Sequence, residues 1–315
     1  MATWLASLMS NVASHVADVD LLFAGLMVTS FFVLVLLFAL LFTFAIRYRA
    51  SNPNADRDHR IKRSWRWEVT WTTLTFIGFL ALFVWGAALY LQVYGRARNA
   101  LAINIVAKQW MWKAQHPGGQ REINELHIPV NRPIRLVMAS QDVIHSFFIP
   151  AFRVKHDVVP GRYQELTIEA LRVGTYHLFC AEFCGTDHAR MGGQIIALES
   201  RDYADWLARQ PNAGDLASQG AALFRALGCS GCHGIGGSVR APPLEGLYGK
   251  PVPLSDGSTV TADDRYLRDS ILQPDRQIVA GYEPKMPSFA DRVSEDELFA
   301  LIAYIKSLAN RESLR

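Results

Sequence analysis

The residues best suited to chemistry lie in one stretch of twelve, CAEFCGTDHARM, near the middle of the chain. It holds two thiols, an imidazole and a thioether at spacings of four, four and three residues, in Cys180, Cys184, His188 and Met191. Two thiolates can bridge two metal ions, and soft sulfur combined with nitrogen favours copper over magnesium or calcium. The spacing therefore predicts half of a two-copper electron-transfer site.

A second imidazole is needed for the other copper. We choose His145, in QDVIHSFFIPAF, because it lies at the end of a β-like run bounded by Pro150. His177 is the rival, since it lies only three residues before Cys180. Side chains three residues apart in a strand point to opposite faces, which disfavours His177.

Three other interpretations of the two thiols remain open at this point. They are a disulfide between Cys180 and Cys184, a zinc site, and a pair of free thiols. Structural zinc rarely recruits methionine, and its short cysteine spacing is usually matched by a second pair of ligands. The donor set therefore favours copper over zinc.

A second motif, CSGCH, contains Cys229, Cys232 and His233 in the spacing of c-type haem attachment. A thioredoxin-like motif is the alternative, but it expects a βαβ setting, whereas this one follows a helical pattern that ends at Gly228. The sixth iron ligand is expected to be Met286, the one methionine after the motif in the sequence. Prolines flank it and favour a fixed loop.

Two long apolar runs precede these motifs, at residues 21–46 and 67–91. Each is long enough to cross a hydrocarbon core of about 30 Å as a helix. Tryptophans at the start of the second run and tyrosines at its end match interfacial aromatic belts. We therefore expect a hairpin of two transmembrane helices within residues 1–95.

The loop between the runs, residues 47–66, carries seven of the 32 basic residues but two of the 29 acidic ones. The positive-inside rule then puts this loop in the cytoplasm and everything after residue 95 on the outer face. The rest of the chain has no basic excess, so no nucleic-acid partner is expected. Glu68 lies at the start of the second run. It is either an acid stabilised by the dipole at a helix start or a carboxylate that collects protons for a path through the membrane.

The remainder of the chain divides into two domains. Residues 96–210 contain short alternating runs between turn signals, which predict an all-β sandwich or barrel. Residues 211–217 are expected to be a linker, and residues 218–315 an all-helical domain whose final helix opens with Ser294 and Glu297 in capping-box register. The fold class is thus a multidomain membrane protein.

At these residues the sequence resembles subunit II of bacterial haem-copper cytochrome c oxidases, in the form with a fused C-terminal cytochrome c domain. The resemblance covers nearly the whole chain and is most specific at QDVIHS, KHDVVPGR and CAEFCGTDHARM. It implies a cupredoxin-like β domain, a class I cytochrome c domain and a dinuclear copper centre called CuA. The implied copper ligands are His145, Cys180, the backbone carbonyl of Glu182, Cys184, His188 and Met191.

The resemblance also implies roles near that centre. The Glu182 carboxylate would reach a magnesium ion at the contact with subunit I. Trp110 would be the residue through which electrons enter the copper centre; the alternative is that it is a core aromatic residue on a strand, which requires only that it be buried. Glu68 matches an acid at the mouth of a proton path, and Pro242 matches a proline whose carbonyl orients the axial imidazole. Three positions depart from the family pattern: Thr75 for proline, Met111 for tyrosine and Ala241 for glycine.

The function implied is an electron relay. A soluble or membrane-bound cytochrome c, or a similar donor, would reduce the haem c, which would pass electrons to copper and on to subunit I. Neither apolar run contains a histidine, so oxygen reduction and proton pumping belong to a partner, subunit I. Subunit III is a further expected partner. The expected location is the bacterial inner membrane, as a multi-pass protein with periplasmic domains.

Two alternatives remain. The chain could be the donor subunit of a copper-containing nitric oxide reductase, whose active centre would also lie on a partner. It could instead be a membrane-tethered copper carrier or electron shuttle. Carriers hold copper in open sites, whereas five side chains and a carbonyl form a closed one.

Overall fold

The computed structural model describes residues 12–53, 55, 65–95, 97, 99–210, 215–233 and 241–309. The chain divides into two compact units, Met1–Gly95 and Arg96–Arg315, and each has its own architecture. Much of the predicted basic loop (54 and 56–64) and of the predicted linker (211–214) lies outside the described residues.

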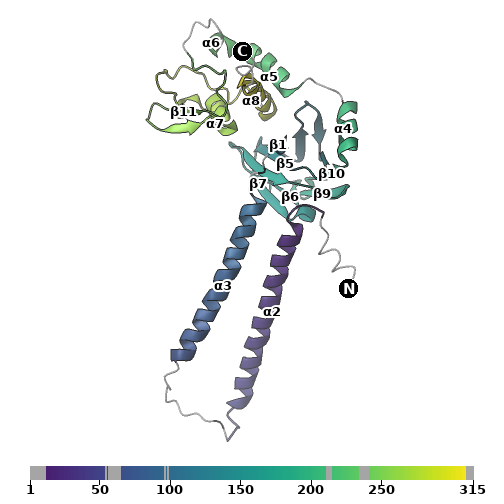
Figure 1. Cartoon of the computed structure of the whole chain (residues 1–315), viewed down its shortest axis with the longest axis vertical. Coiled ribbons are helices and arrows are strands. Elements are labelled where there is room, and N and C mark those ends of the chain that lie inside the picture. Colours follow the sequence, from purple (N-terminus) through teal and green to yellow (C-terminus); the bar gives the residue numbers. More distant parts are fainter. Residues whose placement is uncertain are drawn as a thin grey trace. The chain divides into compact units, whose positions relative to one another are not determined.

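The first unit is built from α2 (Val16–Arg47) and α3 (Trp65–Val93), which run side by side in opposite directions (Figure 1). Both helices extend a few residues beyond the apolar runs that predict them. They approach closely at Gly25, where an added Cβ would lie 3.2 Å from the Trp85 ring.

Large apolar side chains are exposed along both helices. Phe31 is 62 % exposed, Trp67 77 % and Phe83 70 %. A core helix of a soluble protein would bury such residues, whereas a helix in lipid satisfies its own backbone and leaves them outward. Both helices are long and apolar enough to cross a membrane.

The second unit begins with a β-sandwich, as expected from the alternating runs. Its first sheet has the strand order β3-β2-β1-β5-β8 and its second sheet the order β4-β10-β9-β6-β7. The pairs β1–β5 and β4–β10 are parallel, and the other pairs are antiparallel. The strands are β1 (Leu101–Lys108), β2 (Met111–Gln115), β3 (Arg121–Ile123), β4 (Glu125–Pro129), β5 (Ile134–Ser140), β6 (His145–Ile149), β7 (Val154–Val158), β8 (Gln164–Ile168), β9 (Gly174–Cys180) and β10 (Gly192–Leu198).

Two details of the β domain differ from the sequence prediction. The stretch ALAINIVAKQWMW, whose pattern predicts a single run, forms two strands, β1 and β2, joined by a turn at Gln109 and Trp110. His145 is the first residue of β6, whereas the sequence prediction places it at the end of a run. It pairs with Val158, the last residue of the antiparallel strand β7, and this pair begins the β6–β7 ladder. The short helices η1 (Pro150–Phe152), η2 (His188–Arg190) and α4 (Ser200–Arg209) complete this domain.

The last part of the second unit is mostly helical, as predicted, with one small two-stranded sheet added. Its elements are α5 (Leu216–Ala226), α6 (Ser230–His233), β11 (Pro251–Pro253), β12 (Thr259–Thr261), α7 (Asp264–Leu272), η3 (Pro274–Arg276) and α8 (Glu295–Ala309). Helix α5 begins two residues inside the predicted linker, because Asp215 caps it by accepting from the Ser218 N–H at 2.6 Å. The predicted capping box is present: Glu297 accepts from the backbone N–H of Ser294 at 2.8 Å.

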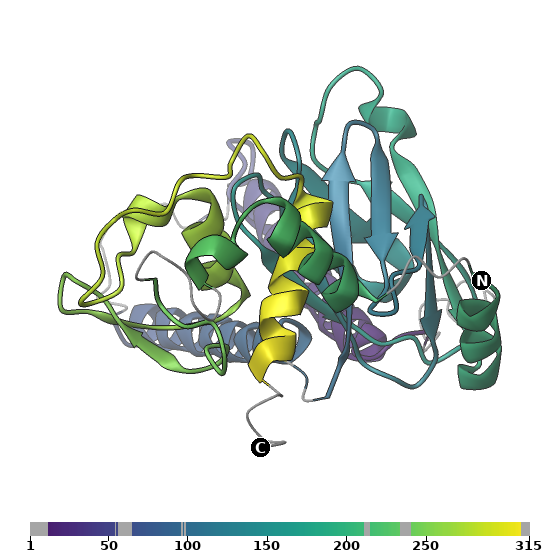
Figure 2. The ribbon, with the colours of Figure 1, turned by 90° about the horizontal axis from the view of Figure 1, so that it is seen from above.

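Helices α5 and α8, the first and last of this domain, cross beside the sandwich (Figure 2). Their closest approach is at Gly220, where an added Cβ would lie 1.9 Å from the Ala300 carbonyl oxygen. No side chain fits there, so the glycine sets the distance between the two helices. Phe224, Leu301 and Ile305 then pack in one core around the crossing.

We predict that Gly220→Ala destabilises the helical domain by about 1–3 kcal/mol, because α5 and α8 must move apart. Thermal unfolding followed by circular dichroism would measure the loss. Gly231→Ala is the matched control, since an added Cβ there meets nothing within 4 Å. Equal midpoints for the two variants would contradict the prediction.

Candidate metal centres

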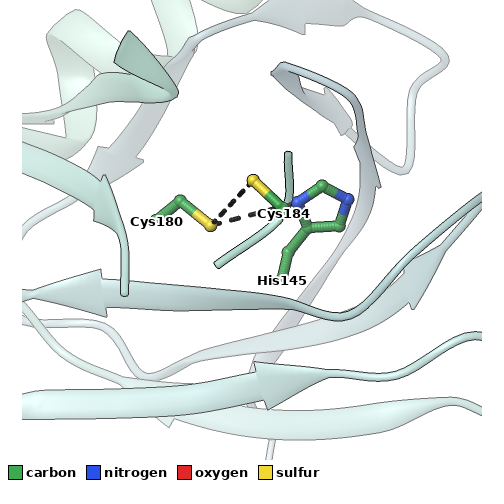
Figure 3. A group of neighbouring side chains, drawn as sticks. All are labelled: His145, Cys180 and Cys184. Atoms are coloured by element: carbon green, nitrogen blue, oxygen red, sulfur yellow. Dashed lines mark hydrogen bonds between the residues drawn. The ribbon is translucent and has the colours of Figure 1, made fainter. Parts of the chain in front are cut away.

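Three potential metal ligands meet where β9, β6 and the loop after β9 come together (Figure 3). Cys180 is the last residue of β9, His145 is the first of β6, and Cys184 follows in the loop. The two Sγ atoms are 3.7 Å apart, and Cys180 Sγ lies 3.9 Å from His145 Nδ1. All three side chains are buried.

Three more donor groups surround the same two sulfur atoms. His188 Nδ1 lies 3.5 Å from Cys184 Sγ, and Met191 Sδ lies 3.7 Å from it. The backbone carbonyl oxygen of Glu182 is 3.3 Å from Cys180 Sγ. We call these six groups the thiol cluster: His145, Cys180, the Glu182 carbonyl, Cys184, His188 and Met191.

The donor set of the thiol cluster discriminates between the open interpretations. Both cysteines are free, and their sulfur separation is far longer than the ~2.05 Å of a disulfide. Closed zinc sites take four ligands, whereas here six groups converge, one of them a thioether. Two thiols with two imidazoles, a thioether and a carbonyl fit a pair of copper ions.

The loop that carries Cys184 is folded by its own backbone. Cys180 N–H donates to Met191 O at 3.0 Å, so the two ends of the stretch are joined where β9 ends and just before β10 begins. Gly185 has a φ of 112°, and an added Cβ would lie 2.9 Å from the Gln109 side chain. A glycine is therefore required where the loop turns back.

The two thiols differ in acidity. Burial raises the pKa of both, but contacts with the His145 imidazole and nearby backbone outweigh burial at Cys180 and lower its pKa. At Cys184 the Cys180 sulfur adds to burial, so the pKa is raised. Cys180 ionises first, and a bound cation would favour loss of the second proton.

Sequence reasoning missed Asp142, which orients His145. His145 Nε2 lies 2.8 Å from an Asp142 oxygen, which leaves Nδ1 facing the sulfur atoms. The same carboxylate accepts from the Gln109 N–H at 2.7 Å. Burial lowers the pKa of His145, but contacts with Cys180 and Asp142 raise it overall. The available signal was an acid three residues before the histidine.

The other predicted residues of this region lie as follows. Trp110 contacts the thiol cluster, because its indole N–H donates to the Cys184 carbonyl at 3.2 Å. The Glu182 side chain is exposed, and His177 is exposed on the face of β9 opposite Cys180, as its spacing predicts. Glu68 lies in the first turn of α3, in the other unit of the chain.

A cavity in the helical domain brings together the second set of predicted residues. Cys229, Cys232, His233 and Met286 all line it, with mostly apolar side chains around them. His233 Nδ1 lies 2.9 Å from the Pro242 carbonyl oxygen, the contact implied by the family resemblance. The motif follows helix α5, without the βαβ setting of a thioredoxin. The residues present fit a c-type haem.

A third polar group, missed by sequence reasoning, lies in the β domain away from both motifs. The buried Glu122 carboxylate pairs with His116 at 2.7 Å and with His127, and it also accepts from the His127 N–H at 2.9 Å. His127 stacks on Trp206 of α4 with ring centroids 4.2 Å apart. Both carboxylate oxygens are occupied, which holds the two histidine rings in place. The stacking of His127 on Trp206 then joins α4 to the sandwich.

Comparisons with known proteins match both domains. Residues 105–199 match the family described as "Cytochrome C oxidase subunit II, periplasmic domain", and residues 217–309 match "Cytochrome c". The chain belongs to the cytochrome c oxidase subunit II family. Together with its two exposed apolar helices, this makes it a membrane protein with periplasmic domains of the copper and haem types.

Relatives of this subunit II chain align over much of its length. Cytochrome c oxidase subunit 2 of Alkalihalophilus pseudofirmus is 29 % identical over 288 residues, which cover 87 % of this chain and 82 % of that protein. The alternative cytochrome c oxidase subunit 2 of Bradyrhizobium diazoefficiens is 27 % identical, over 61 % of this chain and 79 % of the relative. The solved periplasmic domain of subunit II from Bradyrhizobium japonicum is 34 % identical, over 36 % of this chain and 95 % of that domain, with a TM-score of 0.35.

We predict that Glu122→Gln destabilises the β domain of this subunit II chain by about 1–3 kcal/mol at neutral pH, because the amide has an NH2 donor in place of one of the two oxygens that contact the histidines. Burial raises the pKa of Glu122, but its hydrogen bonds to His116 and His127 lower it overall, from 4.5 to about 2. The carboxylate's contribution is therefore fully present above about pH 4.5 and is lost as the pH falls toward 2.

Denaturant unfolding between pH 7 and pH 3 would measure this difference. The gap between the native chain and Glu122→Gln should narrow below about pH 4.5. Glu125→Gln, at an exposed neighbouring carboxyl, is the control and should show little change. A gap that is constant with pH would refute the assignment.

Proposed function

We propose that this chain is the electron-transfer subunit of a terminal cytochrome c oxidase. It accepts electrons from a reduced carrier at a haem c in the helical domain and delivers them through a dinuclear copper centre to subunit I, where oxygen is reduced with proton pumping. The observation that carries the proposal is the convergence of four further donor groups on two free, buried thiols. Copper and haem iron supply one-electron redox chemistry at these two sites when bound.

The residues of the chain have distinct roles in this proposal. The thiol cluster holds the copper pair, and Asp142 keeps His145 in the tautomer that presents Nδ1. Cys229 and Cys232 would attach the haem, and His233 and Met286 would hold its iron. Because the donors sit on paired strands and a folded loop, their positions change little when an electron arrives or leaves.

Three further roles concern partners. Trp110 touches the Cys184 carbonyl, which suits an electron entry point on the copper side. The exposed Glu182 carboxylate is available to a magnesium ion shared with subunit I. Glu68, at the start of α3, would begin a proton path. Subunit III completes the expected complex.

The proposed location is the bacterial inner membrane. The helices α2 and α3 would each cross it once, and the basic loop between them would lie in the cytoplasm. The copper and haem domains would then face the periplasm. Exposed apolar side chains along both helices support this arrangement.

We predict two coppers and one c-type haem per chain in the detergent-purified protein, measured by elemental analysis together with optical and electron paramagnetic resonance spectra. Cys180→Ser should abolish the mixed-valence copper signal, because one of the two thiolates that would hold the copper pair is lost. His177→Ala, on the opposite face of β9, is the control and should retain both coppers. Zinc or a single copper in the native chain would overturn the proposal, as would an assembled complex that reduces nitric oxide but not oxygen.

We also predict that Asp142→Ala lowers copper affinity by about 10–100-fold while the fold is retained, because His145 loses the group that orients its ring. Competition with a copper chelator would measure the change. Asp157→Asn, at a half-exposed carboxylate paired with Lys155, is the control. Copper affinity equal to that of the native chain would show that Asp142 has no orienting role.

A further inference from the structure

The centre of the outer face of the first sheet is buried, although the second sheet of the sandwich packs on the opposite face. In β5, Leu136 and Met138 point into the sandwich and are fully buried. Val137 and Ala139 alternate with them on the other face, yet they are only 3 % and 1 % exposed. The outer face of such a sheet usually meets water, so another part of the molecule must cover these residues.

The cover comes from the helical domain. Val137 and Ala139, together with Val106 on the neighbouring strand, form one apolar cluster with Phe299 of α8. The Tyr163 ring, in the turn before β8, packs against this cluster and stacks on Phe299 with centroids 4.9 Å apart and planes 15° from parallel. The two domains therefore share one apolar core.

A buried arginine completes the contact. Arg268 of α7 donates to the Gly161 carbonyl of the β domain at 2.6 Å and to Glu295 at 2.7 Å. Its guanidinium also lies 5.4 Å from the centre of the Tyr163 ring. Tyr163 is thus held between Phe299 and Arg268, and we call these three residues the anchor.

Ion pairs surround this apolar centre. Lys113 pairs with Asp296 at 3.2 Å between partly exposed side chains, and the partly exposed Arg135 approaches the buried Asp264 at 4.0 Å. An apolar, fully buried centre with a polar rim is the anatomy of a stable protein interface. A contact that formed only transiently would leave Val137 and Ala139 exposed to water for part of the time.

The helices of the anchor also form walls of the haem cavity. Leu267 of α7 and Leu301 of α8 line that cavity, and each is within two residues of an anchor residue. On the other side, β5 leads from Ala139 to Asp142, which contacts His145 of the thiol cluster. The anchor therefore sits on rigid elements that connect the two cofactor sites.

We propose that Arg268, Tyr163 and Phe299 are positioning residues that hold the haem domain permanently on the outer face of the first sheet and so fix the separation of the two redox sites. The inference rests on the proposed function, in which one electron lost by the haem iron is gained by the copper pair and is replaced by the reduced carrier. Because tunnelling rates fall steeply with distance, a fixed separation removes any wait for domain movement.

The test compares Tyr163→Ala with Tyr163→Phe in the full-length, metal-loaded chain. The Tyr163 hydroxyl has no hydrogen-bond partner among the described residues, so the phenylalanine variant keeps the stacking and should behave like the native chain. The alanine variant removes the ring between Phe299 and Arg268. Arg268→Met is a second disruption, and Arg276→Met, at an exposed arginine that pairs within the helical domain, is its matched control.

Two readouts are needed. Calorimetry should show one joint unfolding transition for the native chain, Tyr163→Phe and Arg276→Met, and two separate transitions for Tyr163→Ala and Arg268→Met. After flash reduction, the concentration-independent rate of haem-to-copper transfer should fall at least several-fold in the same two variants, with unchanged haem and copper spectra.

The outcomes separate the two proposals. If Tyr163→Ala retains its spectra, a single transition and the native transfer rate, the anchor has no positioning role. If the native chain binds no copper pair, the proposed function fails, while the calorimetric comparison still decides whether the anchor joins the domains. Should Arg268→Met fail to fold, the two Tyr163 variants carry the test alone.

Discussion

Two thiols that lie close together without bonding are the constraint on which the rest of this structure depends. Cys180 ends β9, where it pairs with Phe147 of β6 and donates its N–H to Met191, and Cys184 is carried by a loop that turns back at Gly185. The backbone therefore sets the distance between the sulfur atoms, and no covalent bond between them is needed. Imidazole, thioether and carbonyl groups can then surround the pair, because each belongs to an element already held in place by the sandwich.

The same sheet serves two cores. Its inner face fills the sandwich, and its outer face is covered by a helix whose domain carries the other redox motif. Strand β5 is consequently buried on both sides, which is unusual for a sheet in a two-layer sandwich. The domain contact and the metal site are therefore connected through the backbone. Strand β5, which supports the contact, leads into the turn that contains Asp142, and Asp142 contacts His145.

Local signals in the sequence predicted much of this arrangement. The spacing in CAEFCGTDHARM and CSGCH indicated both motifs, and the Ser294–Glu297 capping box is present because its hydrogen bonds involve only residues close in the chain. The position of His177 on the opposite face of β9 followed from strand alternation alone. The apolar helices were evident from length and composition, although their ends extend past the apolar residues.

Features that depend on tertiary contacts could not be predicted in this way. Asp142 lies only three residues before His145, but its hydrogen bond from the Gln109 N–H joins residues 33 positions apart and depends on the fold. Glu122, His116 and His127 have no periodic spacing, so nothing indicated their pairing before the strands were placed. The start of β6 at His145 was set by its pairing with β7, which the boundary at Pro150 does not reveal. Asp215 was different: its capping role is local and could have been recognised.

The crossing of α5 and α8 has a consequence for how the haem cavity is completed. Leu301 and Ile305, which form part of its wall, follow every other cavity residue in the sequence, whereas Cys229 and Cys232 precede most of them. The cavity is therefore complete only when the last helix of the domain has packed its backbone against Gly220.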